Sequence, residues 1–284
     1  MDAPVCGIDH IVIAVNDLDA SKNAYARLGF TLSSRGVHSA AMGTINHTMM
    51  LERDYFEILA VAAPTERNQR WRNMLAHGEG VAGLALAAPD AGLVRDAWAR
   101  AGLAPSDVVD FQRAVIRDDG TIKARFKTVS LPSTAEIRLE IFACAQLTRQ
   151  AVWLPELISH PNTASAIGKV TIPVDSPAKV AEACRPVFTG CTISTIDGGL
   201  RLITGRHWID LVHPEAIVRN FNAVTGSQRA VAIGIDFIVQ DLGACSSVLS
   251  GNGVSAWKGE RRLEVSSAYA AGAAIAFTTA DALV

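Results

Sequence analysis

The stretch GIDHIV at residues 7–12 decides the fold, because it returns near the other end of the chain as GIDFIV at residues 234–239. A second motif behaves in the same way: AYARLGF at residues 24–30 returns as AWARAGL at residues 97–103. A weaker copy of the opening motif begins near residue 167, which brings the number of copies to four. Such repetition indicates that one supersecondary unit is reused, so equivalent positions can be compared between copies.

The first copy shows the local structure of this unit best. Residues 8–15 are β-branched and apolar enough for a strand, Asp17 suits the N-cap of a helix, and Gly29 suits the residue that ends it. Three more extended runs follow, at residues 31–34, 44–51 and 55–61. The unit is therefore predicted to have the order βαβββ, and the other three copies follow it.

Residues 147–164 contain two prolines and mark the boundary between two halves. We expect an N-terminal domain over residues 1–150 and a C-terminal domain over residues 151–284, each made of two units. The single helix of a unit covers only one face of its strands, and pairing two units leaves a cupped sheet with a concave face. The predicted fold class is α+β, with four βαβββ modules paired into two cupped mixed β-sheet domains.

Composition excludes several classes of function. A formal net charge of -2 gives no electrostatic reason to expect nucleic acid or an anionic membrane surface. No apolar run reaches the ~18 residues of a membrane-spanning helix, and the N-terminus has no signal-peptide pattern. The five cysteines form no CxxC pair, which favours reduced thiols and a cytoplasmic location. Motifs of the types GxGxxG, GxxxxGK[ST] and GxSxG are missing, which argues against nucleotide-dependent enzymes and serine hydrolases.

The doubled unit, with a histidine on its first strand and a glutamate on its last, resembles the vicinal oxygen chelate superfamily of glyoxalase I, extradiol dioxygenases and bleomycin-resistance proteins. Three stretches resemble the glyoxalase-like domain proteins more closely: GVH with GTIN at residues 36–38 and 43–46, YFEIL at residues 55–59, and CAQLT with HPN at residues 144–148 and 160–162. The resemblance covers essentially the whole chain. It implies the vicinal oxygen chelate fold and several alternative chemistries on one scaffold.

In this family a metal ion lies in the cup, held by the first and last strands of two paired units. The resemblance places His10 and Glu57 of the first copy and Glu140 of the second at three of these four positions, and Gly83 at the fourth. An imidazole with two carboxylates suits a divalent ion with open positions, such as Zn, Mn, Fe or Ni. The adjacent oxygens of a substrate then chelate the ion. Gly83 offers no ligand and widens the pocket.

Each proposed ligand has a structural alternative. His10 could be a hydrogen-bonded core histidine, and Glu57 an exposed strand residue, although its apolar neighbours make an unpaired carboxylate costly there. Glu140 could belong to a surface ion pair.

Two further residues are candidates for catalysis. His38 could act as a general acid or base at the mouth of the cup, or could simply bond the backbone of a loop. Asn46 could orient a substrate oxygen, or bridge two strands. Arg125 and Lys127 could clamp a substrate carboxylate, or form the solvated face of a strand.

The second half does not offer the same groups. Its equivalent positions hold Lys169, Asp210, Phe237 and Ala276, so we expect no metal site there and an ion pair between the first two. This half would serve as scaffold or as a dimer surface, and a homodimer is a possibility that the family suggests.

Two functions from different classes follow. The first is a metal-dependent lyase, isomerase or dioxygenase that acts on a small molecule with vicinal oxygens. The second is a metal-free protein that sequesters a small ligand in the same cup, as resistance proteins do. Gly83 favours the second function, and the three remaining ligand positions favour the first. A structural homologue without activity is a third possibility.

Overall fold

A computed structural model describes residues 5–117, 120–134, 136–137, 139–220 and 233–283. The first module consists of β1 (Ile8–Val15), α1 (Leu18–Arg27), β2 (Gly36–Val37), β3 (Thr44–Met50) and β4 (Tyr55–Val61). A connecting helix, α2 (Gln69–Leu75), leads to the second module, which consists of β5 (Gly80–Ala87), α3 (Ala91–Arg100), β6 (Val109–Arg117), β7 (Gly120–Ser130) and β8 (Glu140–Gln146).

The second half repeats this order. The third module consists of β9 (Ala164–Pro173), α4 (Pro177–Cys184), β10 (Thr192–Ile196), β11 (Gly199–Thr204) and β12 (His207–Val212), and is followed by α5 (Pro214–Asn220). The fourth consists of β13 (Gly234–Val239), α6 (Leu242–Gly251), β14 (Ala256–Lys258), β15 (Arg262–Val265) and β16 (Ala274–Thr278). Short 3₁₀ helices span Arg149–Ala151, Pro155–Leu157, Ser267–Tyr269 and Ala280–Ala282.

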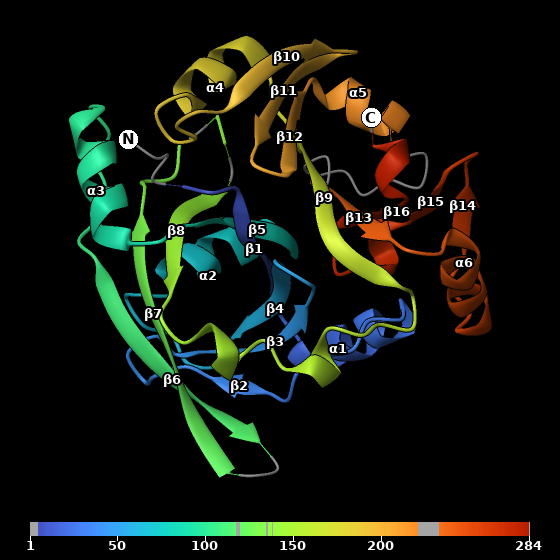
Figure 1. Cartoon of the computed structure of the whole chain (residues 1–284), viewed down its shortest axis with the longest axis horizontal. Coiled ribbons are helices and arrows are strands. Elements are labelled where there is room, and N and C mark those ends of the chain that lie inside the picture. Colours follow the sequence, from blue (N-terminus) through green and yellow to red (C-terminus); the bar gives the residue numbers. More distant parts are fainter. Residues whose placement is uncertain (1–4, 118–119, 135, 138, 221–232, 284) are drawn as a thin grey trace.

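The strands form two 8-stranded mixed sheets with the same topology, β2-β3-β4-β1-β5-β8-β7-β6 and β10-β11-β12-β9-β13-β16-β15-β14 (Figure 1). In each sheet the first strands of two modules pair antiparallel at the centre, and each of them pairs parallel with the last strand of its own module. The predicted α+β fold class is confirmed. Among the described helices, none combines the length and the apolarity needed to cross a membrane.

The predicted helix boundaries follow from local chemistry. Asp17 and Asp90 are the N-caps of α1 and α3, and their carboxylates accept bonds from backbone N–H groups of the first turn. Gly29 and Gly102 follow the same helices with φ of 84° and 82°, a left-handed conformation that favours glycine. The strand predicted at residues 31–34 is wrong: this segment makes one backbone bond, from Ser33 N–H to Thr48 O, and the strand forms at β2 instead.

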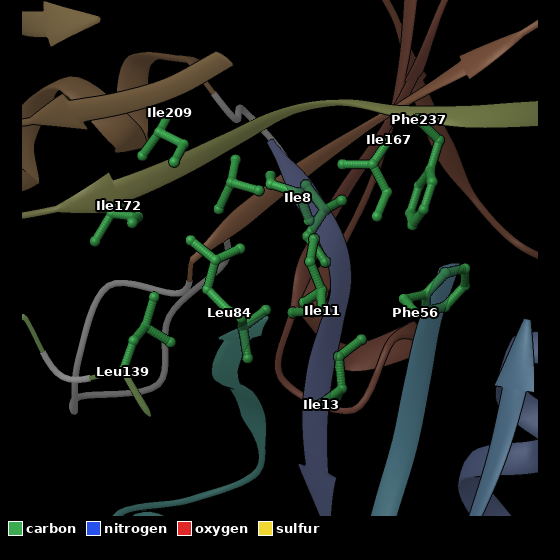
Figure 2. Packing of buried hydrophobic residues seen from close by; sticks show 14 of the residues in the cluster. Ile8, Ile11, Ile13, Phe56, Leu84, Leu139, Ile167, Ile172, Ile209 and Phe237 are labelled. Carbon is green, nitrogen blue, oxygen red and sulfur yellow. The ribbon is translucent and has the colours of Figure 1, made fainter. Parts of the chain in front are cut away.

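The main core lies between the helices and the convex faces of both sheets. Figure 2 shows Ile11 and Phe56 of the first sheet beside Ile167 and Phe237 of the second, and all four side chains are buried. The rings of Phe56 and Phe237 lie 4.8 Å apart between their centroids. Burial of side chains of this size is the largest favourable contribution to folding, so the two halves stabilise each other.

The concave faces of the two sheets differ in whether they enclose a hollow. The edge strands β2 and β6 of the first sheet approach each other, so this sheet nearly closes on itself around a hollow. In the second sheet, Ala216 and Ile217 of α5 pack with Val212 and Ala276 on the concave side. The hollow therefore belongs to the first sheet.

A buried histidine ties the segment between the halves to the first sheet. The Nδ1 atom of His160 accepts the backbone N–H of Thr31 at 2.9 Å, and its Nε2–H donates to Met50 O at 2.8 Å. The ring can make both bonds only in its neutral form. Burial accordingly lowers the pKa of His160.

We expect acid to destabilise the protein partly through His160. As the pH falls below about 6.5 the unfolded chain takes up the proton before the folded chain does, so stability present above that pH is lost below it. The midpoint of thermal unfolding should therefore fall between about pH 7.5 and pH 5.5, and it should fall less in His160→Gln. The exposed His77→Gln is the control and should keep the wild-type dependence. An unchanged dependence in His160→Gln would contradict this account.

Candidate functional site

The concave face of the first sheet lines a cavity of about 730 Å³, counted with its open mouth. Four of the predicted site residues line it, namely His10, His38, Asn46 and Glu57. Glu140, the fifth, is not among the residues that line it. The cavity is a suitable place for a small ligand, because it is concave and its wall combines polar and charged groups with apolar and aromatic side chains.

A β-bulge in β1 sets the orientation of His10. The pairing with β5 shifts between Ile8 and His10, so that Asp9 can reach the ring of its neighbour. The Nδ1–H of His10 donates to Asp9 Oδ2 at 2.7 Å, and Gln146 Nε2 donates to the same oxygen at 2.9 Å. With its Nδ1 atom held in this way, His10 presents the electron pair of Nε2 to the cavity.

Glu57 lies next to His10 on the inner face of β4. Its Oε1 atom is 3.9 Å from His10 Nε2, and its Oε2 atom accepts a short hydrogen bond from Asn46 Nδ2. The carboxylate is buried in a wall that includes Tyr55, which stacks on the imidazole with ring centroids 4.4 Å apart. Asn46 therefore holds the carboxylate that faces the histidine.

Glu140 is held differently. It pairs with Gly83 across β5 and β8, and it is buried. Ser133 Oγ donates to its Oε1 atom, while the guanidinium of Arg70 lies 3.9 Å from its Oε2 atom. Arg70 comes from the connecting helix α2 and itself lines the cavity. The structure thus brings His10 and Glu57 together and gives Glu140 a cationic partner of its own.

The glycine position is occupied by a neighbouring aromatic ring. A Cβ atom on Gly83 would lie 3.1 Å from Trp71 Cη2, so the indole of α2 fills the side on which a fourth ligand would stand. Trp71 is buried and lines the cavity. The sequence predicts a wider pocket at Gly83, whereas Trp71 takes up that space.

His38 lies at the other side of the cavity, next to β2. Its Nδ1 atom is hydrogen-bonded to Thr44 Oγ1 at 2.7 Å. Burial lowers the pKa of His38, the charge of Glu57 opposes this effect, and the charge of Arg113 adds to it. His38 is therefore neutral near pH 7 and can either accept or donate a proton at the ring.

The residues fit a divalent ion in one half of the site. Bonds of about 2.0–2.2 Å from an ion to nitrogen and oxygen allow two ligands to lie up to about 4.3 Å apart, and the 3.9 Å between His10 Nε2 and Glu57 Oε1 is within this range. Asp9 supplies the carboxylate that a metal-bound histidine usually has behind it. The half that contains Gly83 and Glu140 fits less well, because Trp71 and Arg70 occupy it.

Within the described residues, one group of three potential ligands lies together, with donor atoms all within 4.8 Å of one another: Asp9, His10 and Cys144. Burial raises the pKa of the Cys144 thiol well above its usual value, and the charge of Asp9 adds to this. A bound metal ion would itself favour the thiolate form of Cys144. His10 is the ligand that this group shares with the His10–Glu57 pair.

The concave face of the second sheet carries an ion-pair network instead. Lys169 Nζ lies 3.9 Å from Asp210 Oδ2 and 3.6 Å from Asp236 Oδ2. Arg201 forms two bonds with Asp210, of 2.7 and 3.0 Å, and Arg262 Nη2 lies 3.0 Å from Asp236 Oδ2. Each of these buried carboxylates thus has protein cations beside it.

The equivalence of Phe237 with His10 holds in the sequence but not in space. Phe237 is buried against Phe56 in the core between the sheets, whereas His10 faces the cavity. Asp236, which precedes it, pairs with Lys169 of the neighbouring strand.

Sequence reasoning missed four residues of the site: Asp9, Arg70, Trp71 and Arg113. The repeat contained a signal for Asp9, since the Asp–His order of β1 has Asp–Phe as its counterpart in β13. No local pattern distinguishes the other three from surface or core residues. Arg125, a predicted carboxylate clamp, is exposed and lies 3.6 Å from Asp110.

The chain is similar to several known proteins. The family described as glyoxalase-like domain matches residues 8–188, whereas no curated protein matches the sequence. A hypothetical protein from Staphylococcus aureus has a similar structure, with a TM-score of 0.65 and 13% identity over 96% of this chain and 98% of that chain. The Mn(II)-bound glyoxalase from Novosphingobium aromaticivorans gives a TM-score of 0.56 and 13% identity over 98% and 83% of the two chains. A variant of homoprotocatechuate 2,3-dioxygenase from B. fuscum gives 0.57 and 11% over 98% and 72%. At these identities the similarity establishes the fold.

Gly36 should be necessary for the position of Asn46. The two residues pair across β2 and β3, and a Cβ atom on Gly36 would overlap Asn46 Oδ1. We expect Gly36→Ala to displace the amide from Glu57 and to lower the free energy of unfolding by about 1–3 kcal/mol in chemical denaturation. Gly251→Ala, where a Cβ atom meets nothing within 4 Å, is the matched control. If Gly36→Ala and Gly251→Ala have the same free energy of unfolding, the close approach of Gly36 to Asn46 is contradicted.

Proposed function

Because the chain belongs to the glyoxalase-like domain family, within the vicinal oxygen chelate superfamily, we propose that it is a metal-dependent lyase, isomerase or dioxygenase that acts on a small molecule with adjacent oxygen atoms. The cavity of the first sheet is the proposed substrate site. One observation supports the metal above others: His10 Nε2 and Glu57 Oε1 face each other at 3.9 Å, each fixed from behind by a hydrogen bond.

In this proposal His10 and Glu57 are the principal ligands of a divalent ion. Glu140 joins them as a third ligand when it exchanges Arg70 for the ion. Manganese is a suitable first probe, because the glyoxalase with the similar fold is Mn(II)-bound. Zn, Fe and Ni remain candidates on the chemistry of the ligands.

The protein residues around the ion have separate proposed roles. A bound divalent ion would supply Lewis acidity to the adjacent oxygens of the substrate. Asp9 fixes the tautomer of His10, and Asn46 is a positioning residue because its amide is bonded to Glu57. His38 is the proposed general acid or base, since a neutral imidazole can take a proton from the substrate and return it.

Metal content tests the proposal directly. We expect wild-type protein purified without chelator, or soaked in Mn²⁺, Zn²⁺ or Fe²⁺, to carry about one ion per chain by elemental analysis. His10→Ala and Glu57→Ala should lose it, and Asp9→Asn should bind Mn²⁺ about 10–100-fold more weakly. His77→Ala is the exposed control and should match the wild type. Equally low metal in all proteins after soaking would refute metal dependence.

A metal-free binding protein is the second candidate, and a separate observation favours it. Arg70 and Trp71 occupy the half of the site that the family uses for two further ligands.

Arg70→Met tests whether Glu140 can become a metal ligand. If Glu140 is a metal ligand, removal of the guanidinium frees it, and calorimetric titration with Mn²⁺ should show about tenfold tighter binding, which Glu140→Gln then abolishes. Arg67→Met, an exposed arginine near the same helix, is the control. Unchanged Mn²⁺ affinity in Arg70→Met and in Glu140→Gln would exclude Glu140 as a ligand.

A further inference from the structure

Arg113 lies in the wall of the cavity, without an acidic partner in the part of the chain that the structure describes. It lines the cavity from β6, near the place where this edge strand approaches β2, and its Nη1 atom is 3.3 Å from the position that a Cβ atom of Gly36 would take. Among the described residues, no carboxylate lies within 4.0 Å of its guanidinium, and no hydrogen bond engages it. Its charge nevertheless reaches His38 and Tyr55 on the inner wall.

A second guanidinium in the same wall is incompletely bonded. Arg70 Nη1 donates to Ser130 Oγ at 3.1 Å and lies 3.9 Å from Glu140 Oε2, while its buried Nε has no hydrogen-bond partner in the part of the chain that the structure describes. The wall of the cavity thus carries two guanidinium groups, and Arg113 is the one without an acidic partner among the described residues. Such a wall favours an anionic ligand.

Part of the remaining wall is aromatic. Phe111 and Phe126 stack with their centroids 5.1 Å apart and their planes at 22°, and Phe111 contacts His38 edge-on. Phe111 is two residues from Arg113 on the same strand, so both side chains project from the same face of β6. A planar ring would therefore find an apolar surface directly beside a cation.

We propose that the ligand of this cavity is an aromatic carboxylate, whose carboxylate group is bound by Arg113 and whose ring lies against Phe111 and Phe126. The proposal names the substrate class of the proposed function and rests on the same cavity. Arg113 is then a specificity-determining residue, because planar guanidinium groups bind carboxylates through two parallel hydrogen bonds.

Arg125 on the adjacent strand β7 provides a matched control. It is exposed and lies 3.6 Å from Asp110, so its charge is already partnered outside the cavity. The Arg113→Gln and Arg125→Gln variants remove the same charge from neighbouring strands. If ligand binding changes in Arg113→Gln and not in Arg125→Gln, the effect comes from the location of the Arg113 charge in the cavity and not from the loss of one positive charge alone.

The probes are benzoate and its neutral analogue benzamide, titrated by calorimetry into metal-free protein. We expect wild-type protein and Arg125→Gln to bind benzoate more tightly than benzamide. Arg113→Gln should weaken benzoate binding about tenfold or more and leave benzamide binding unchanged, since charged hydrogen bonds contribute that much. Circular dichroism checks that each variant is folded, and if Arg113→Gln is not, Arg113→Lys replaces it and should show reduced discrimination. Equal affinity for the two probes, no benzoate binding, or discrimination that survives in Arg113→Gln would overturn the proposal.

The same titration in His10→Ala separates this inference from the proposed function. Benzoate binding that persists in a protein unable to hold Mn²⁺ supports Arg113 as the anion site. If wild-type protein binds no metal while Arg113 still discriminates between the probes, only metal dependence fails. If the metal binds and Arg113 does not discriminate, only the substrate class fails.

Discussion

The antiparallel pairing of β1 with β5 is the constraint on which the site depends. It places Val12 opposite Gly83, while the parallel partners of these two strands bring Glu57 beside Val12 and Glu140 beside Gly83. These four positions therefore lie in one row across the two modules, and strand alternation puts His10, two residues before Val12, on the same concave face. The bulge in the same strand pair then turns Asp9 towards His10. The backbone pairing thus determines which side chains of this part of the site share one face.

Much of the fold was predictable because its determinants are local. Helix caps such as Asp17 and the glycines that end helices act within a few residues, and the repeated motifs place the strands. His10 and Glu57 were singled out through the resemblance to the vicinal oxygen chelate superfamily, and the structure places both in the wall of one cavity. Arg70 and Trp71 were not predictable, because they reach the site from a connecting helix whose docking is set by tertiary packing. The opposite orientations of His10 and Phe237 show the same limit.

The two sheets place different groups beside their buried carboxylates. Buried carboxylates need a nearby positive charge, because desolvation of an unpaired charge is costly. In the second sheet, Lys169 and the neighbouring arginines supply it from the protein itself. In the first sheet, Arg70 lies beside Glu140. Among the described residues, the imidazole of His10 is the one basic group within 4.0 Å of the Glu57 carboxylate. One topology thus carries a self-neutralised face and a face suited to a ligand.

The contact between Trp71 and Gly83 couples these two positions in any change towards four ligands. A histidine or glutamate introduced at Gly83 would meet the indole at its first side-chain atom, 3.1 Å away and also 3.3 Å from Val12 Cβ. The substitution alone would therefore destabilise the protein before it could improve binding. Replacing Trp71 with a smaller residue would make room for the new side chain, but by itself it leaves a void in the wall. Each change is unfavourable without the other, so mutation by single steps preserves the present arrangement.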